Sequence, residues 1–575
     1  MLVAQIITSM TVMICMLIDS IMIGRFLGVD SMTAYGLATP ILLVFAAFGS
    51  MLSAGIQVMC GKTVGCGDME STNGCYSSSV FIAAAVSLAG VAAVLIFTDP
   101  ICTLLGAGTP SPENQIFELT RDYIRGFIIG APAFIFAQIM VPFMQISGNR
   151  TRLVVAVVAM TVGDIVFDIL NVTVIGGGTF GMGLASSISY YIAFFIGAAY
   201  FVKKNCLFKF RASLIKAKTC SATLKCGVPT VINQISLVLL VFVLNKLLLD
   251  VGQTSAVAAY SVISTVGNLC YCFGGGVASV ALMLSAMFYT DDEKTGLYSL
   301  VKTMTFYALI LDAIVTVIVF AASPVFVALF LEDPGAKDMA IVGVRLFSLS
   351  LIPSSMNTSF KYYYQGINRS GLTQAISVMQ NFAFIALFAL ILSRFMGTYG
   401  VWLSYLCGEA VTFIVICAVV WTINKKISVS KETFSLLPSD FGAKEGDYFE
   451  TTVTTPCGPS EASVKAGEFC IEHGESVRNS HMIALCIEEM TNNIVQHGFA
   501  KDGKKHSIDI RLVFRDGKRV IRIRDNCVSF DPTKYIELHK ADDPMSHIGI
   551  RMVMKTVKNA NYINSLGLNN LTLEL

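Results

Sequence analysis

The stretch Thr151-Arg-Leu-Val-Val-Ala-Val-Val-Ala-Met-Thr-Val-Gly-Asp164-Ile-Val-Phe-Asp168-Ile-Leu-Asn-Val-Thr-Val-Ile175 carries the two features that decide the fold of this chain. It is almost wholly apolar, and it exceeds the about 20 apolar residues that a helix needs to cross a bilayer. It also carries Asp164 and Asp168, which are four residues apart and so share one helix face. The stretch therefore predicts a membrane span that holds a pair of buried acids.

The composition of the whole chain agrees with this prediction. Of its 575 residues, 54% are hydrophobic and only 14% are charged, whereas a soluble domain carries about 25% charged residues. The charges are unevenly spread, since 38 of the 80 lie in the last 145 residues. We expect a membrane part followed by a soluble part. The net charge of +2 gives no field that would attract a nucleic acid, so none is expected as a partner.

Twelve runs are long and apolar enough to cross a membrane. The loops after the fourth, sixth and twelfth runs are rich in Lys and Arg, and loops of this kind stay in the cytoplasm. We therefore expect a multi-pass protein of the inner or plasma membrane with both termini in the cytosol. The predicted spans are 2–23, 34–60, 78–98, 120–147, 151–175, 181–202, 224–250, 256–289, 300–322, 341–367, 373–395 and 399–423.

The two halves of the membrane part resemble each other weakly. Thr33-Ala-Tyr-Gly36 recurs as Ala258-Ala-Tyr-Ser261, and Pro132 has a counterpart in Pro353. Two six-helix repeats with a substrate path between them are a common transporter plan. The membrane part covers residues 1–425, with repeats at about 1–202 and 224–423.

Periodicity changes after a polar linker at 426–446. Strand-like and helix-like patterns then alternate over 447–575, which predicts a cytosolic α+β domain. The expected elements are a strand at Phe449–Thr455, helices at Ser460–Glu475 and Ser480–His497, and strands at 508–514 and 520–523 joined by the Asp516-Gly517 turn.

Acids inside membrane spans need an explanation. An acid at a helix centre costs about 2.5–3.5 kcal/mol on insertion scales, yet Asp19 also lies in an apolar run. Counted along the helices, Asp19, Asp164 and Asp168 can line one pocket in the outer half of the first repeat. Such a cluster can exchange a proton or Na⁺ for a cationic substrate. The alternative is that each acid lies at a helix end or in water. Other charges are expected to pair across helices or to line the cavity: Asp312, Arg345, Lys361 and Glu409.

Several short motifs in a fixed order carry a family resemblance. They are Asp19–Gly28, Ala34–Pro40, Gly65–Asp68, Tyr123–Arg125, Gly148–Arg150, Lys225–Pro229 and Gly397–Trp402. Together they resemble the MATE (multidrug and toxic compound extrusion) transporters over residues 1 to about 425. The resemblance implies a secondary antiporter that exports organic cations or drugs in exchange for Na⁺ or H⁺.

The resemblance also implies a cation-coupling site. Asp19 matches the first-helix Asp of the family, Asp168 the fifth-helix Asp, and Ser186 the sixth-helix Thr. Asp164 stands where the family has Asn. This departure adds a titratable charge, and it leaves the choice between Na⁺ and H⁺ open.

The last part has candidate nucleotide-binding residues. No GxxxxGK[ST] motif is present, which argues against an ABC-type motor. Glu489 and Asn493 share a helix face, where Asn493 can ligate Mg²⁺ and Glu489 can act as a general base. Asp525 ends a strand and can accept a hydrogen bond from the adenine amino group. Gly549 lies at a helix start, where backbone N–H groups suit phosphate.

These motifs resemble the N, G1 and G2 boxes of the GHKL ATPases, particularly the anti-sigma-factor serine kinases. The resemblance covers about 447–575 and implies a Bergerat-type fold that binds ATP and Mg²⁺. Asn493 would hold the Mg²⁺, Asp525 would read adenine, Gly549 would lie in the lid, and Glu489 would be the catalytic base. Cys527 replaces the first Gly of the G1 box, so binding is expected while kinase activity stays open.

Two other functions remain possible on the sequence. The chain can be a membrane-anchored sensor whose serine kinase domain acts on a cytosolic protein partner. It can also be a lipid-linked saccharide flippase, which the cations Arg345 and Lys361 allow but the acidic cluster disfavours.

Overall fold

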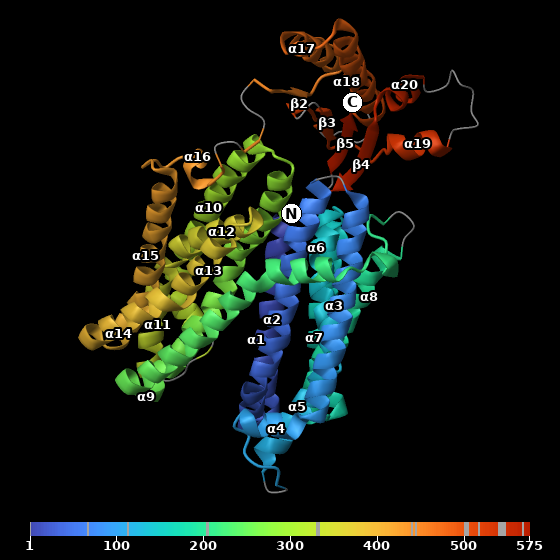
Figure 1. The fold of residues 1–575 in the computed structure, drawn as a ribbon. Helices are drawn as coiled ribbons and strands as arrows, with labels where there is room; N and C mark the ends of the chain where they lie inside the picture. The colour runs from blue at the N-terminus through green and yellow to red at the C-terminus, as the bar shows by residue number, and fades with distance from the viewer. Residues whose placement is uncertain are drawn as a thin grey trace.

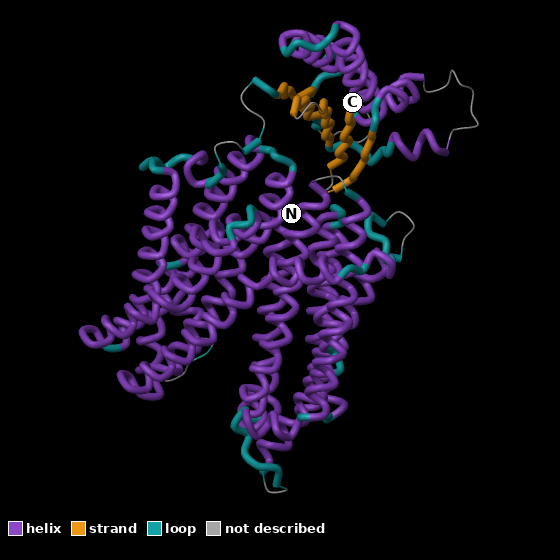
Figure 2. The backbone as a smooth tube through the Cα atoms, viewed as in Figure 1, coloured by secondary structure: helices purple, strands orange, loops and turns teal. Residues whose placement is uncertain are grey.

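The computed structural model describes residues 2–65, 68–111, 114–202, 206–328, 330, 334–438, 441–442, 446–499, 505–515, 518–538, 548–565 and 568–575. It has two parts: a large helical body, and a small part of helices and strands that lies against one end of this body (Figures 1 and 2). We call this the domain-bearing end. The predicted turn at Asp516-Gly517 lies outside the described residues.

The first six predicted spans form a first lobe. Its elements are α1 (Leu2–Met22), η1 (Ile23–Leu27), α2 (Val29–Gly65), α3 (Met69–Ile96), α4 (Thr98–Leu104), α5 (Gln115–Ile128), α6 (Ala131–Ile146), α7 (Arg150–Leu170), η2 (Asn171–Ile175) and α8 (Gly178–Phe201). Aromatic and aliphatic side chains from most of these helices form one continuous buried core, with Phe117, Phe127 and Phe143 fully covered.

The next six predicted spans form a second lobe. Its elements are α9 (Ala217–Thr290), α10 (Lys294–Ala328), α11 (Pro334–Leu349), α12 (Leu351–Gly366), α13 (Ser370–Val378), η4 (Met379–Ala383), α14 (Phe384–Met396) and α15 (Thr398–Asn424). The short η3 (Ala212–Leu214) lies on the connection between the two lobes. The second lobe has its own buried cores around Trp402 and Tyr363.

Helix α9 carries two candidate spans, Ala217–Leu248 and Ala259–Thr290. Thr223 lies against Gly55 of α2, and Ala286 lies against Gly61 of the same helix. In a straight helix these two residues of α9 would be roughly 90 Å apart. The helix must therefore turn back on itself, so that both of its ends lie at the domain-bearing end.

The expected number of spans agrees with the structure. Ten helices are long and apolar enough to cross a membrane, and two bent pairs raise the number to as many as twelve among the described residues. The bends measure 47° between α5 and α6 and 44° between α11 and α12. Pro132 and Pro353, the prolines that the repeat pairs, lie just after these bends. Since proline lacks a backbone donor, it favours a helix break directly before it.

The small part contains one antiparallel sheet in the order β1-β2-β3-β5-β4. Its strands are β1 (Tyr448–Val453), β2 (Ile508–Arg515), β3 (Lys518–Asp525), β4 (Asn559–Ser565) and β5 (Leu568–Glu574), and its helices are α17 (Gly458–Glu472), α18 (Val477–Gly498), α19 (Pro532–Leu538) and α20 (Ile548–Thr556). The predicted α+β pattern is present, with element ends shifted by a few residues.

One face of this sheet is covered by α17 and α18. Alternate residues of the strands, among them Ile510, Leu512 and Ile523, are buried against Ile483 and Ile487 of α18. The opposite face points toward the helical body, as Figure 1 shows.

The segment read as a linker is partly folded. It contains the short α16 (Lys431–Phe434), and Phe434 and Leu436 are buried in the core of the second lobe. The hydroxyls of Tyr363 and Tyr364 donate to the carbonyls of Ser435 and Phe434 at 3.2 and 3.1 Å. Sequence analysis weighed the polar residues of 426–446 and overlooked these apolar anchors.

Candidate functional site

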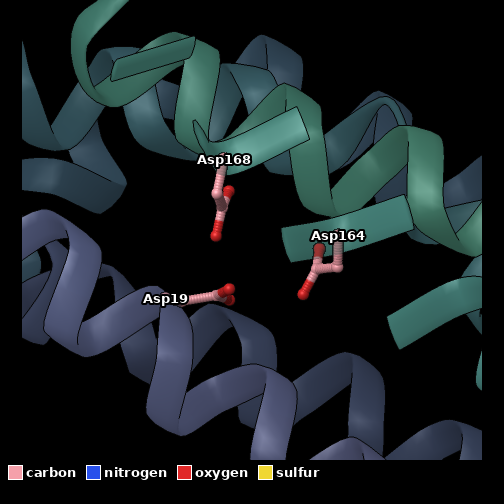
Figure 3. Close-up of side chains that lie close together, drawn as sticks. All are labelled: Asp19, Asp164 and Asp168. Carbon is pink, nitrogen blue, oxygen red and sulfur yellow. The ribbon is translucent and has the colours of Figure 1, made fainter. Parts of the chain in front are cut away.

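The three aspartates of the first lobe meet in space. Asp19 comes from α1, while Asp164 and Asp168 come from neighbouring turns of α7. One carboxylate oxygen of each lies within 4.8 Å of those of the other two. Figure 3 shows the three side chains pointing toward one another from the two helices. Since a helix turns once in 3.6 residues, the spacing of four keeps both α7 acids on the face that meets α1.

The cluster is buried and poorly satisfied. Its members are between 0% and 8% exposed. Four of its six oxygens accept no hydrogen bond within the part of the chain that the structure describes: Oδ1 of Asp19, Oδ1 of Asp164 and both oxygens of Asp168. Buried polar atoms in folded proteins nearly always have partners. Orphaned carboxylate oxygens that converge on one point are therefore a donor set for a small cation.

Hydroxyl groups border the cluster. Ser186 of α8 donates to Oδ2 of Asp19 at 3.4 Å, so the fourth residue predicted for the coupling site lies beside the acids. Cys15, one turn before Asp19, donates to Oγ1 of Thr161 at 3.6 Å. Tyr35 and Tyr123 pack edge to face nearby, with ring centroids 5.3 Å apart. Sequence analysis missed Cys15 and Thr161, although each lies three or four residues from a cluster acid on the same helix.

A cavity of about 280 Å³ opens in the first lobe, on the domain-bearing side of the cluster. Met160, which lines it, lies one helical turn before Asp164 on α7. Four methionines line the cavity together with aromatic and small polar side chains: Met13, Met140, Met144, Met160, Phe134, Tyr190, Gln5, Gln138, Ser9 and Ser53. No charged residue lines it within the described ranges. Methionine side chains are polarizable and adaptable, so such a wall accommodates apolar ligands of varied shape.

Three of the four charged residues singled out in the second lobe form hydrogen bonds with neighbouring side chains. Nζ of Lys361 donates to Oδ1 of Asn233 at 2.7 Å and to Oε1 of Gln380 at 3.0 Å. Glu409 accepts from Nδ2 of Asn357 at 2.8 Å. Arg345 donates to Ser323 at 3.0 Å. Asp312 is 2% exposed, and its Oδ2 has no partner among the described residues. Pairing across helices, one of the two expected roles, describes the first three.

The small part has a pocket of about 190 Å³ between α18 and the sheet. Asp525, at the end of β3, lies in its wall and is 4% exposed. Nδ2 of Asn569 and the backbone N–H of Cys527 donate to Asp525 Oδ1 at 2.8 and 2.9 Å. Both of these bonds end on Oδ1. Burial raises the pKa of the Asp525 carboxyl above its ordinary value.

The walls of this pocket combine an apolar slot with a polar mouth. Met490, Ile494 and Leu571 supply the apolar surface, and Asn493 lies beside them on α18. Nδ2 of Asn493 donates to the carbonyl of Glu489 at 2.7 Å. The Oδ1 atom is therefore the part of this side chain that a metal ion can take. The pocket suits a flat, partly polar ring better than a charged group, because its wall is mostly apolar.

Glu489 of α18 and Gly549 of α20 are brought together. A Cβ atom added to Gly549 would lie 1.9 Å from Oε2 of Glu489, so a larger residue here would displace the Glu489 carboxylate. Glu488, the other acid of the pair, instead accepts from the hydroxyls of Ser460 and Ser463 and so ties α18 to α17.

Comparison with known proteins concerns the helical body. The model of the MatE family matches residues 4–170 and 229–391, one segment in each lobe. Among curated relatives are multidrug export proteins MepA. The one from Staphylococcus saprophyticus is 21% identical over 71% of this chain and 89% of its own, and the one from Staphylococcus haemolyticus is 22% identical over 69% and 87%.

Solved structures share the arrangement of the lobes. A MATE transporter in complex with MaL6 aligns with a TM-score of 0.68, and the outward-facing form of a multidrug resistance MATE family transporter aligns with 0.67. Each is 20% identical and covers 72% of this chain and 92% of its own. The fold and the buried acids thus define a polytopic membrane protein of two matched helical lobes. The chain belongs to the MatE family.

Proposed function

We propose that this protein exports organic cations, including drugs, across the cell membrane in exchange for Na⁺ or H⁺. The buried cluster of Asp19, Asp164 and Asp168 carries this proposal, because it offers to a small cation four oxygens that have no hydrogen-bond partner among the described residues. Acids kept at such cost inside a membrane protein mark ion paths. The printed names of the MepA relatives, multidrug export proteins, support the substrate class.

The cavity next to the cluster supports an exchange mechanism. Met160 faces the cavity and Asp164 joins the cluster one turn away on α7. A cationic ligand in the cavity and a small cation among the acids would therefore compete for the same negative charge. Entry of the ion would then displace the drug, and rocking of the two lobes would carry the site from one side to the other.

Orientation follows from charge. The connection after α8 carries basic residues, including Lys209 and Arg211, whose backbone N–H groups donate to Asn73 and Ser77 near the start of α3. The excess of Lys and Arg in this loop favours the cytosol. The domain-bearing end would accordingly be cytosolic, together with both termini.

Transport into or out of vesicles tests this function. Ethidium efflux would be followed in vesicles with an imposed Na⁺ or proton gradient. Asp168→Asn is expected to lower gradient-driven efflux at least tenfold, since it removes a coupling charge. Asp312→Asn is the matched control: it makes the same change at an equally buried acid of the second lobe, and should leave the gradient dependence intact. Unchanged efflux in the Asp168 variant would overturn the coupling role.

We further propose that residues 447–575 form a regulatory domain that binds ATP and Mg²⁺. The pocket closed by Asp525 and Asn569 beside Asn493 supports it. Asp525 Oδ2 would accept a hydrogen bond from the adenine amino group. The apolar wall would stack on the ring, and Asn493 Oδ1 would ligate the Mg²⁺. ATP would not drive transport in this scheme.

Calorimetry on the purified chain tests nucleotide binding. Asp525→Asn removes a charged acceptor, and a hydrogen bond to a charged group is worth about 1.5–3 kcal/mol. We therefore expect ATP to bind at least about tenfold more weakly. Asp531→Asn is the control, since Asp531 caps α19 through Thr533 and does not line the pocket. Equal affinities of the Asp525 variant and the unaltered chain would exclude this adenine site.

A serine kinase acting on a cytosolic protein is a second candidate activity of this domain. The contact between Glu489 and Gly549 favours it, because it sets a general base beside the helix start expected to face phosphate. Transfer of the γ-phosphate to a protein serine, abolished by Glu489→Ala but kept in Glu488→Ala, would establish it. Saccharide flipping has less support, since Lys361 and Arg345 bond within the second lobe and no cation lines the cavity within the described residues.

A further inference from the structure

The sheet face that turns away from α18 has an unusual composition. Arg511, Arg522 and Arg524 point from β2 and β3 to this face, opposite to the buried Ile510 and Ile523. Arg511 is only 8% exposed. Arg522 and Arg524 are partly buried, with side chains 28% and 22% exposed. Arginines that lose part of their hydration need acidic partners. The partners lie on the helical body.

The arginines meet the end of α9 and the residues after it. Nη2 of Arg522 lies 2.7 Å from Oδ1 of Asp291, and Nη1 donates to the Asp291 carbonyl at 2.8 Å. Nη2 of Arg524 lies 3.3 Å from Oε2 of Glu293 and 3.6 Å from Oδ2 of Asp291. The Asp291 side chain is 6% exposed and that of Glu293 is 14% exposed, whereas those of Arg522 and Arg524 are 28% and 22% exposed. Water therefore screens these pairs only in part.

The same sheet face touches both lobes. Ile563 of β4 is 4% exposed and joins the core cluster that contains Val64, at the end of α2, and Met287, near the end of α9. All three line one small cavity together with the arginines. The sheet thus covers the end of a first-lobe helix and the end of a second-lobe helix at once.

These two helices form the seam between the lobes. A Cβ on Gly55 of α2 would lie 2.2 Å from the carbonyl of Thr223, and one on Gly227 of α9 would lie 2.1 Å from the carbonyl of Met51. Nζ of Lys62 also crosses the seam, to Oδ1 of Asn368 at 2.6 Å. These contacts all involve the half of α2 nearest the sheet, and Figure 1 shows the lobes diverging toward the opposite end.

We propose that the C-terminal domain is a clamp that holds the domain-bearing side of the seam closed, through Arg522 and Arg524 on Asp291 and Glu293. This inference rests on the alternating access assumed above, in which α2 and α9 must part when the transporter opens on that side. A C-terminal domain bound to the ends of both α2 and α9 opposes the separation of these helices. The clamp must release before each such opening, which gives the domain control over transport.

A one-sided change breaks the clamp. Removing Arg522 and Arg524 takes away the ion pairs of Asp291 and Glu293 and leaves only Arg511 facing Asp291. Breaking a buried pair in this way is far more costly than replacing both partners. We therefore expect R522M/R524M to shift the equilibrium toward release by about 100-fold or more. The added changes D291L/E293L remove the stranded acids and are expected to restore docking.

Cys226 reports the state of the seam in the full-length chain. This half-buried thiol packs in a cluster of Ala54 and Val58 of the first lobe with Leu282 and Ala286 of the second. Parting of the lobes would uncover it. Its labelling rate with a maleimide is read by mass spectrometry of the peptide that contains it. The rate is expected to rise at least tenfold in R522M/R524M and to fall back to that of the unaltered protein in the quadruple variant R522M/R524M/D291L/E293L. R519M is the control, since Arg519 pairs with Glu475 inside the domain.

The outcomes separate the clamp from the transport proposal. Unchanged Cys226 labelling in R522M/R524M overturns the clamp, and so does equal acceleration in R519M, which would indicate a general loss of domain structure. The clamp is also contradicted if the quadruple variant is labelled as fast as R522M/R524M. Absence of ethidium efflux from the unaltered protein would refute the export function while leaving the labelling result intact.

Discussion

Replacing Asp168 by Asn should uncouple the protein from its ion and at the same time relieve strain in the cluster. Two ionised carboxylates whose oxygens lie within 4.8 Å of each other repel each other by about 3 kcal/mol or more at an effective dielectric constant of about 20. A cation held among the three acids offsets this repulsion. The amide of the variant keeps the shape of the side chain but removes the charge of Asp168. Both oxygens of that carboxylate lack a hydrogen-bond partner among the described residues.

The assay is thermal unfolding of the purified protein over a Na⁺ series at constant ionic strength, and over a pH series without Na⁺. A ligand at 100 times its Kd stabilises the folded state by about 2.7 kcal/mol. The unaltered protein should show a shift of this order in one of the two series. The Asp168 variant should begin more stable by about 1–3 kcal/mol, the share of the pair repulsion that it relieves, and should then respond little to either ion.

Asp312→Asn makes the comparison specific. Asp312 is equally buried and has an unpaired oxygen, but it lies in the second lobe, away from the cluster. Its variant should keep the ion-dependent shift of the unaltered protein. The reasoning fails if the Asp168 variant still gains full stability from the ion, or if the Asp312 variant loses that gain as well.

Three further outcomes are expected. Gly549→Ala places a Cβ 1.9 Å from Oε2 of Glu489, and moving a catalytic group by about 1 Å can lower the reaction rate about 100-fold. If the domain is a kinase, ATP turnover should therefore fall about 100-fold, while ATP affinity measured by calorimetry changes less than threefold. An unchanged turnover would exclude Glu489 as the base. Burial raises the pKa of Asp525, so protonation on acidification removes its acceptor at a higher pH than for an ordinary aspartate; ATP affinity should fall as the pH is lowered from 7 to 5, and a flat profile would contradict the role of this carboxylate. Burial also raises the pKa of Asp291 to about 6, although Arg522, Arg524 and Arg511 face it and oppose the shift, while Glu293 adds to it. The docked state then binds more protons than the released state, so Cys226 labelling, corrected for thiolate content, should slow as the pH falls from 7 to 5.5. Faster labelling at the lower pH would contradict this direction.

Much of this architecture could be read from the chain. Apolar length is a local property, so the twelve spans and the polar segment after them follow from the sequence. The two bent spans were predicted only as single runs, but the paired prolines Pro132 and Pro353 already marked where they bend. Asp164 and Asp168 could be assigned to one helix face because the α-helical period is fixed. Three of the five strands, β1, β2 and β3, were predicted from their residue patterns, whereas β4 and β5 were not.

The meeting of distant residues needed the tertiary structure. Nothing in the local pattern says which face of α1 packs on α7. The sequence could therefore place Asp19 at a depth compatible with Asp164 and Asp168, but their contact follows only from the packing. The anchors Phe434 and Leu436 were hidden in a segment whose average composition is polar.

The sequence by itself determined that this is a membrane protein of two similar halves with acids where lipid should exclude them, because hydropathy and helical period act within one segment. Only the tertiary structure decided that Arg522 and Arg524 meet Asp291, more than 200 residues earlier in the chain. Such a contact depends on the shapes and charges of two completed surfaces, and no local period of the sequence encodes how those surfaces fit together.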